Sequence, residues 1–284
     1  MNLPKVNIKQ LLEAGVHLGH KTFRWNPKMD KFIFGAKNSI HIIDLVQTLE
    51  MTNAALIQIH KCIASGGKIL FVSTKKQATE AITSLAKDTS QFYVNHRWLG
   101  GMLTNWKTIS NSIKYYKKLS EDLKKENIGF TKKEILKMSA ERDKLERSLG
   151  GIADMKKIPE MIFIIDTNVE SLAVKEAIKL NIPIVAIVDS NSDPSGINFP
   201  IPGNDDARRA INLYCELVKA TVIDAQKNII TKDSAEIESK PQSQESQQNE
   251  KKQDLKMKEK KDTIIKKTTS ILSKIKTLTS KKSK

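Results

Sequence analysis

Three short runs of mainly apolar residues limit what this chain can fold into more than any other feature. The runs cover residues 68–72, 161–165 and 184–188, and each one follows glycines or a proline. They are uninterrupted and rich in β-branched side chains, as strands that are buried on both faces must be. Helical patterns at residues 78–87 and 169–180 separate them. This alternation predicts an α/β domain in which helices flank a parallel sheet.

Two shorter segments are candidates for further strands. They cover residues 92–94 and 197–201. Because Pro200 has no N–H to donate to a neighbouring strand, we expect the second segment at an edge of the sheet.

The segment from residue 107 to residue 149 has a different pattern. In each half, mainly apolar positions recur at alternating steps of three and four residues, which is a heptad-like stripe. Residues 127–130 interrupt the stripe, and Thr131 with Glu134 has the spacing of a capping box that starts a new helix. We therefore predict a protruding antiparallel helical hairpin, a coiled coil. The alternative is that both helices simply cover the sheet.

Composition divides the chain into three parts. Residues 1–106 and 150–226 carry the α/β pattern, residues 107–149 form the hairpin insertion, and residues 227–284 form a basic C-terminal extension. The extension has 16 Lys and 8 acidic residues, and almost nothing to bury at residues 242–249. We predict that it is largely disordered. The alternative is a basic amphipathic helix at residues 264–278, on RNA or on a membrane surface.

The charge balance favours a polyanionic partner. The chain has 48 Lys and Arg against 32 Asp and Glu, a formal net charge of +16. Such an excess indicates RNA, DNA or an anionic membrane surface. The sequence shows no signal peptide and no apolar stretch long enough to span a membrane, and Cys62 and Cys215 lack a metal-binding or disulfide spacing. We expect a soluble, cytoplasmic protein with reduced thiols.

Parallel α/β sheets often bind nucleotides, so an enzyme has to be considered. The chain has no Gly-x-x-x-x-Gly-Lys-Ser/Thr loop for phosphates and no Gly-x-Gly-x-x-Gly turn for a dinucleotide. It also lacks a Gly-x-Ser-x-Gly nucleophile elbow. We therefore assign no catalytic residue and expect no required cofactor.

Two groups of residues could hold a metal ion. His17 and His20 are spaced to share one helical turn, but no cysteine is near enough to complete a ligand set. Asp189, Asp205 and Asp206, with Asp193 nearby, lie where a parallel sheet places its ligand crevice. Carboxylates that meet there would suit a divalent cation. The alternative role of these aspartates is helix capping and turn formation.

Cationic and aromatic residues alternate in two segments. Residues 20–28 and 95–101 each contain an Arg-Trp pair. RNA bases can stack on such rings while Lys and Arg hold the phosphates. Core packing is the alternative for both tryptophans. The predicted RNA-binding residues are Lys21, Arg24, Trp25, Lys28, Arg97 and Trp98.

The same segments resemble a known family, the bacterial small-subunit ribosomal protein two. The likeness spans residues 3–226, while the extension beyond them is not covered. Leu18 stands where the family usually has an aromatic residue, and Arg208 where a smaller or apolar one is common. The matching segments, in the family's order, are residues 14–20, 24–29, 33–35, 97–105, 145–152, 191–194 and 201–207.

The resemblance implies a flavodoxin-like parallel sheet with a protruding helical hairpin, on the small ribosomal subunit and in contact with its rRNA. It also implies other small-subunit proteins as partners and a role in docking the largest of them, protein one. We assign partner binding to Phe32 and Phe34. The expected function is a non-enzymatic structural constituent of the ribosome in translation. The alternatives are a nucleotide-dependent enzyme and a membrane-surface adaptor that uses the C-terminal extension.

Overall fold

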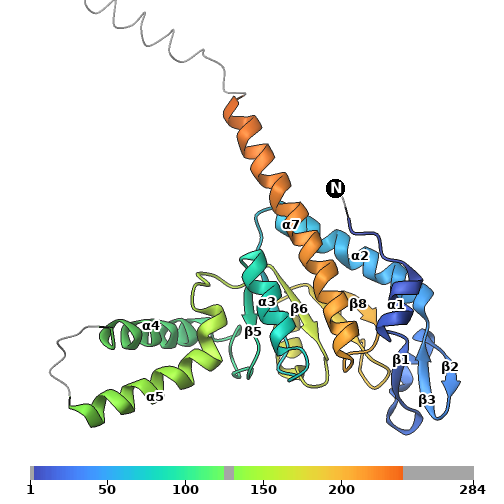
Figure 1. Cartoon of the computed structure of the whole chain (residues 1–284), viewed down its shortest axis with the longest axis horizontal. Coiled ribbons are helices and arrows are strands. Elements are labelled where there is room, and N and C mark those ends of the chain that lie inside the picture. The colour runs from blue at the N-terminus through green and yellow to red at the C-terminus, as the bar shows by residue number, and fades with distance from the viewer. Residues whose placement is uncertain (1–2, 125–130, 239–284) are drawn as a thin grey trace, which may run out of the picture. The chain divides into compact units, whose positions relative to one another are not determined.

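The three apolar runs form the middle of a parallel sheet in the computed structural model (Figure 1). The strands are β4 (Ile69–Val72), β5 (Phe92–Val94), β6 (Met161–Ile165), β7 (Ile184–Val188) and β8 (Phe199–Pro202). They lie in the order β5-β4-β6-β7-β8, and each neighbouring pair is parallel. This is the flavodoxin-like strand order. The predicted α/β class is confirmed, and β8 lies at an edge as Pro200 required.

The structure describes residues 3–124 and 131–238, with side chains as far as residue 228. The chain separates into two compact units, residues 1–230 and 231–284, and the description below concerns the first. The predictions for residues 242–249 and 264–278 fall outside the described residues. The three-part division of the chain therefore stays a prediction.

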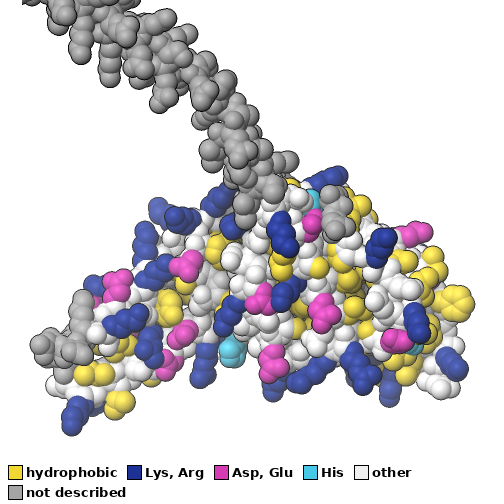
Figure 2. Space-filling model, turned by 45° about the horizontal axis from the view of Figure 1, so that its top comes forward, with side chains coloured by type: hydrophobic (Ala, Val, Ile, Leu, Met, Phe, Trp, Pro, Cys, Tyr) yellow, Lys and Arg dark blue, Asp and Glu magenta, His cyan; other side chains and the backbone are white. Residues whose placement is uncertain are grey.

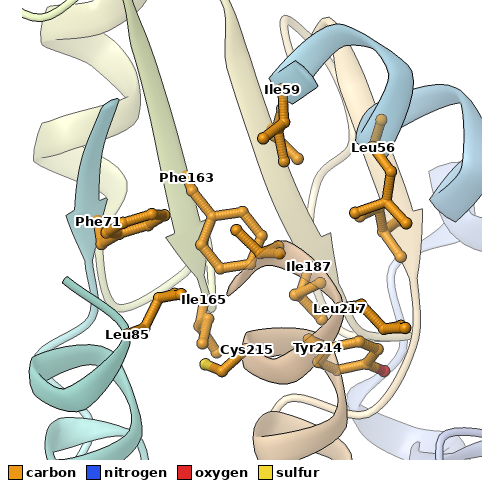
Figure 3. Close-up of a cluster of buried hydrophobic side chains, with 14 of the residues drawn as sticks. Leu56, Ile59, Phe71, Leu85, Phe163, Ile165, Ile187, Tyr214, Cys215 and Leu217 are labelled. Carbon is orange, nitrogen blue, oxygen red and sulfur yellow. The ribbon is translucent and has the colours of Figure 1, made fainter. Parts of the chain in front are cut away.

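One face of the sheet is covered by the helices α2 (Leu45–Ala64), α3 (Thr79–Thr89) and α7 (Arg208–Glu238). Figure 3 shows strand residues such as Phe71, Phe163 and Ile187 packed against Leu56, Leu85 and Tyr214 from these helices. The rings of Phe71 and Phe163 meet edge to face, with centroids 5.9 Å apart. Such a pair adds about 0.5–1.5 kcal/mol to the gain from burial. The short helix α1 (Ile8–Ala14) packs on α2.

The opposite face of the sheet is covered by α6 (Ser171–Lys179) and by the roots of two longer helices, α4 (Trp106–Asp122) and α5 (Lys132–Leu149). Ile109 and Ile113 of α4 and Leu149 of α5 are buried in this second cluster. α4 therefore joins the core at its N-terminal end, and α5 joins it at its C-terminal end.

Beyond these roots, α4 and α5 contact each other and extend past the edge of the sheet (Figure 1). The predicted capping box is present, because the Thr131 N–H donates to Glu134 Oε2 at 2.8 Å and the Glu134 N–H donates to Thr131 Oγ1. We call the two helices the α4–α5 pair. That they form a coiled coil stays a prediction, and the predicted break at residues 127–130 lies outside the described residues.

A second, antiparallel sheet precedes α2 and was not predicted. It consists of β1 (Leu18–Lys21), β3 (Ile40–Ile43) and β2 (Ile33–Lys37), in that order. Asn38 and Ser39 join β2 to β3, and both have positive φ angles, as a two-residue type I′ hairpin requires. The 3₁₀ helices η1 (Thr22–Arg24) and η2 (Pro27–Phe32) connect β1 to β2. The strands are short and half exposed, so their apolar pattern is weak.

Candidate nucleic-acid interface and acidic cluster

The first predicted RNA-binding segment forms an exposed loop between β1 and β2. Lys21 and Arg24 are exposed, and the Arg24 guanidinium lies over the exposed ring of Phe23, 5.5 Å from its centroid. Trp25 is 36% exposed, and its ring tilts against His41 at 5.3 Å. The loop thus presents two cations and two accessible rings side by side.

Contacts with the main sheet hold this loop in place. The Asn26 N–H donates to the Ser190 carbonyl at 2.8 Å, just beyond β7. The Lys28 ammonium donates to Asp193 Oδ2 at 2.7 Å and to Ser195 Oγ at 3.1 Å. This ion pair lowers the pKa of Asp193 to about 2. Lys28 therefore links the loop to residues that follow β7, and it is also exposed on the surface of the loop.

The two phenylalanines assigned to partner binding differ in exposure. Phe32 is only 2% exposed and packs in the core, with the Lys31 ammonium 4.7 Å from its ring centroid. Phe34 is 81% exposed. A partner can reach Phe34 but not Phe32, so we withdraw the assignment of Phe32.

The second predicted RNA-binding segment, residues 95–101, also contains one exposed and one buried candidate residue. Arg97 is exposed, but Trp98 is only 6% exposed and packs in the second core cluster. Its indole N–H donates to Glu176 Oε1 at 3.1 Å. Because a buried ring offers no face to an RNA base, core packing accounts for Trp98, and its assignment to RNA binding is withdrawn.

Glu176 of α6 organises this segment, and no sequence pattern indicated it. Its carboxylate accepts the N–H groups of Gly101, Leu103 and Thr104 at 2.8, 3.0 and 3.1 Å, besides the Trp98 indole. Burial disfavours the charged form, but these hydrogen bonds outweigh burial and lower the pKa of Glu176. The loop between β5 and α4 is thus built around one carboxylate.

Acidic residues converge at the carboxyl ends of the parallel strands, as the sequence predicted. Here the Lys75 ammonium lies 2.7 Å from carboxylate oxygens of Asp166, Asp205 and Asp206. His20 contacts two further carboxylate oxygens, with Nδ1 2.9 Å from Asp189 Oδ2 and Nε2 3.4 Å from Asp206 Oδ2. Four aspartates therefore surround one lysine and one histidine. We call these six residues the acidic cluster.

Burial and neighbouring charge shift the proton affinities in the acidic cluster. Burial raises the pKa of Asp205 to about 7, and the charges of Asp166 and Asp189 act in the same direction against Lys75. Burial disfavours the Lys75 cation, but the surrounding carboxylates outweigh burial and raise its pKa. The hydrogen bond to Asp189 likewise outweighs burial and raises the pKa of His20.

The set of candidate metal ligands differs from the predicted one. One ligand atom each from His20, Asp189 and Asp206 lie within 4.8 Å of one another. Asp205 is not in this set, and its carboxylate accepts a hydrogen bond from the Lys75 ammonium at 2.7 Å. His17 is not in this set, so the set does not support a metal site shared by His17 and His20. Asp193 lies apart, paired with Lys28.

Two members of the acidic cluster were missed although a signal existed. Asp166 directly follows β6, as Asp189 directly follows β7, and Lys75 comes three residues after β4. The rule that singled out Asp189 applies equally to both positions.

Comparisons with known proteins connect this geometry to a family. The sequence model of the family described as ribosomal protein S2 matches residues 11–225. The chain belongs to the ribosomal protein S2 family. The match begins in α1 and ends in α7, so it includes both sheets, the α4–α5 pair and the acidic cluster.

Relatives in this S2 family are named small ribosomal subunit protein uS2. Those of Parvibaculum lavamentivorans and Sinorhizobium medicae are 58% identical over 224 residues, which cover 79% of this chain and 88% of each relative. The relative from Phenylobacterium zucineum is 57% identical over 224 residues, with 76% of its length covered. The resemblance inferred from the sequence is thus confirmed.

Proposed function

We propose that this chain is a structural, non-enzymatic constituent of the small ribosomal subunit that binds rRNA. The observation that carries the proposal is membership of the S2 family, with relatives that are named as small-subunit proteins. The comparisons support neither a nucleotide-dependent enzyme nor a membrane adaptor. None of the helices in the described residues is both long and apolar enough to cross a membrane.

The contact residues are Lys21 at the end of β1, Arg24 and Trp25 on the β1–β2 loop and Arg97 after β5. Within the described part of the chain, no carboxylate pairs with Lys21, Arg24 or Arg97, so each is available to a phosphate. The exposed part of the Trp25 ring would stack on an unpaired base. Lys28 uses two of its three donors on Asp193 and Ser195, which leaves one for a phosphate.

The test replaces Lys21, Arg24 and Arg97 together by Ala. We expect rRNA affinity to fall by about tenfold or more, because three phosphates are no longer neutralised and their counterions are no longer released. Incorporation into small subunits should fall in parallel, as measured by sedimentation and mass spectrometry.

The matched control replaces three exposed lysines on other helices by Ala, namely Lys61, Lys87 and Lys175. It removes the same charge without touching either loop. Equal incorporation of both variants and the natural chain would contradict the assigned contacts. Failure of the natural chain itself to enter small subunits would contradict the proposed function.

We infer from the family resemblance that Phe34 contributes to docking of protein one. Its ring is the most accessible on the antiparallel sheet, and it has given up little surface to the core. Small subunits carrying Phe34→Ala should therefore retain less protein one by mass spectrometry than those carrying Phe23→Ala. Equal retention would remove this assignment.

The acidic cluster is a candidate site for a divalent cation, with His20, Asp189 and Asp206 as ligands. A nitrogen and two carboxylate oxygens suit zinc better than magnesium. Calorimetric titration with Zn²⁺ should show binding by the natural chain, and weaker binding by Asp189→Asn. If no heat of binding is measured, the metal site is contradicted, and these residues only form hydrogen bonds with one another.

A further inference from the structure

A row of cations runs along one face of α5. Lys133, Lys137, Lys144 and Arg147 are all exposed, and the steps between them are four, seven and three residues. Steps of this size keep side chains on one side of a helix. From first to last they span about 21 Å at 1.5 Å per residue. Figure 2 shows Lys and Arg side chains, in dark blue, over this end of the molecule.

The row ends in a hollow between α5 and the loop after β5. Its volume is about 440 Å³, and its lining includes His96 and Arg97 from the loop, with Lys144 and Arg147 from α5. Two segments that are far apart in the sequence thus place three exposed cations and an imidazole around one concavity. Arg97 is the residue that connects the row to the contacts already proposed.

Nearby carboxylates do not neutralise this row. Among the described residues, none forms an ion pair with Lys137, Lys144, Arg147 or Arg97. Asp143 also lines the hollow, but the Arg142 guanidinium donates to it at 2.6 Å.

Two glutamates on α5 are directed elsewhere. Glu141 interacts with the Tyr115 hydroxyl of α4. Glu146 does not line this hollow but a neighbouring one, which shares His96, Asp143 and Arg147 with it. The hollow beside Lys144 therefore keeps a positive charge.

We propose that this row, from Lys133 to Arg147 and on to Arg97, binds the sugar-phosphate backbone of a double-stranded rRNA segment. The inference rests on the proposed function and adds to it a second surface and the form of RNA that the surface takes. Duplex nucleic acid carries one charge per roughly 1.7 Å of axis, so a row of about 21 Å can meet several phosphates. Double-stranded RNA is recognised by shape and backbone, which suits a row without aromatic side chains.

An acidic protein segment fits this surface less well. The centre of a protein interface is usually apolar or aromatic, whereas the lining of the hollow contains one apolar side chain, that of Ala140. The exposed Leu136 lies near the opposite end of the row. Ala140 and Ser148 are small, and they leave the hollow open between the cations.

The test removes three charges of the row with Lys137→Gln, Lys144→Gln and Arg147→Gln in the full chain. The matched control removes three from the other helix of the same pair, with Lys107→Gln, Lys114→Gln and Lys118→Gln. Those lysines are also exposed, and Gln keeps a similar helix propensity at all six positions. Binding of a small-subunit rRNA transcript is measured over a salt series, with polyglutamate as an acidic polypeptide probe.

We expect the row variant to bind rRNA about tenfold or more weakly, while the control changes by less than about threefold. The slope of log affinity against log salt should become shallower by about 0.9 for each phosphate that the variant no longer neutralises. Unchanged rRNA binding by the row variant would overturn this inference and leave the proposed function intact. Reduced binding of polyglutamate alone would also overturn it, in favour of a protein partner.

A second measurement does not depend on affinity. An iron chelate on Ala140→Cys, in a Cys62→Ser background, should cleave the rRNA transcript within a base-paired segment, whereas one on Asn111→Cys of α4 should cleave it weakly there. Cleavage confined to single-stranded loops would contradict a duplex partner. If the natural chain does not bind the transcript at all, that result contradicts the proposed function itself and not only this inference.

Discussion

The carboxylate of Glu176 determines the path of residues 98–104, which lead from the sheet into α4. Three backbone N–H groups and the Trp98 indole donate to it. A buried donor that loses its partner costs about 1–3 kcal/mol. One side chain on α6 therefore supports the loop that carries Arg97, the residue shared by both proposed RNA surfaces.

Replacing Glu176 by Gln tests this role at the level of a single residue. The amide keeps the shape but turns a donating NH₂ group toward donors, so we expect the free energy of unfolding to fall by about 2–3 kcal/mol. Urea denaturation followed by circular dichroism measures the change. Glu216→Gln, at an exposed position of α7, should stay within about 0.5 kcal/mol. Similar values for both variants would contradict the role of Glu176.

The acidic cluster should make stability depend on pH in an unusual direction. Asp205 has a pKa of about 7 in the folded chain and a lower one when unfolded, so the folded state binds more protons in between. Stability must then fall as pH rises from about 4 to 7. The raised pKa of His20 acts with the same sign, because stability that is present below pH 6.5 is lost as pH rises through the folded value.

Urea denaturation between pH 5 and pH 8, with a chelator present, measures this dependence. Asp205→Asn should flatten the decline below pH 7, and His20→Gln should flatten the part above about 6.5. An unchanged decline in both variants would assign the pH dependence to groups outside the acidic cluster.

At the scale of elements, the end of α5 is fixed by a close approach to β5. A Cβ atom on Gly151 would collide with the Tyr93 carbonyl oxygen and lie 2.8 Å from the Tyr93 ring. Only a residue without a side chain allows this approach, which sets the angle at which α5 leaves the sheet. The backbone of β5 is held in the ladder with β4 and cannot retreat easily.

Gly151→Ala is therefore expected to lower the free energy of unfolding by about 1–3 kcal/mol, the usual cost of overpacking. The matched control is Gly100→Ala, where an added Cβ would meet no atom within 4 Å. Thermal denaturation of both variants measures the difference. Equal melting temperatures would show that α5 can shift without cost.

At the scale of the whole molecule, net charge is the property that matters for binding. The formal charge of +16 attracts a polyanion over a distance of about a Debye length, roughly 8 Å in physiological salt. Many cations on the described body are exposed, while Lys75 is enclosed by carboxylates. The exposed cations are thus available to RNA. Lys75, at the ends of the strands, instead forms ion pairs within the acidic cluster.

Binding of the full chain to an rRNA transcript should therefore weaken steeply with salt. For about six or more bound phosphates, raising salt from roughly 50 to 200 mM should cost about a thousandfold in affinity. Filter binding over this range measures the effect. A slope near zero would show that cations do not carry the interaction.

The amino-acid sequence by itself determined the class of the fold, because burial on both faces requires strands without polar positions and short-range patterns report that directly. β4, β6 and β7 and the Thr131 cap follow from such local rules. Short sequence segments also indicated the family. The sequence did not predict the antiparallel sheet, because its strands are short and only partly buried.

Only the tertiary structure decided which candidate side chains are available. Trp25 and Trp98 both follow an arginine, yet one is exposed and the other is a core residue held by Glu176. Asp205, a predicted metal ligand, pairs instead with Lys75 and is not among the three grouped ligands. These outcomes depend on groups that lie 78 and 130 positions away in the chain and meet only after folding. Burial and charge pairing of this kind are properties of the packed molecule, which no local pattern contains.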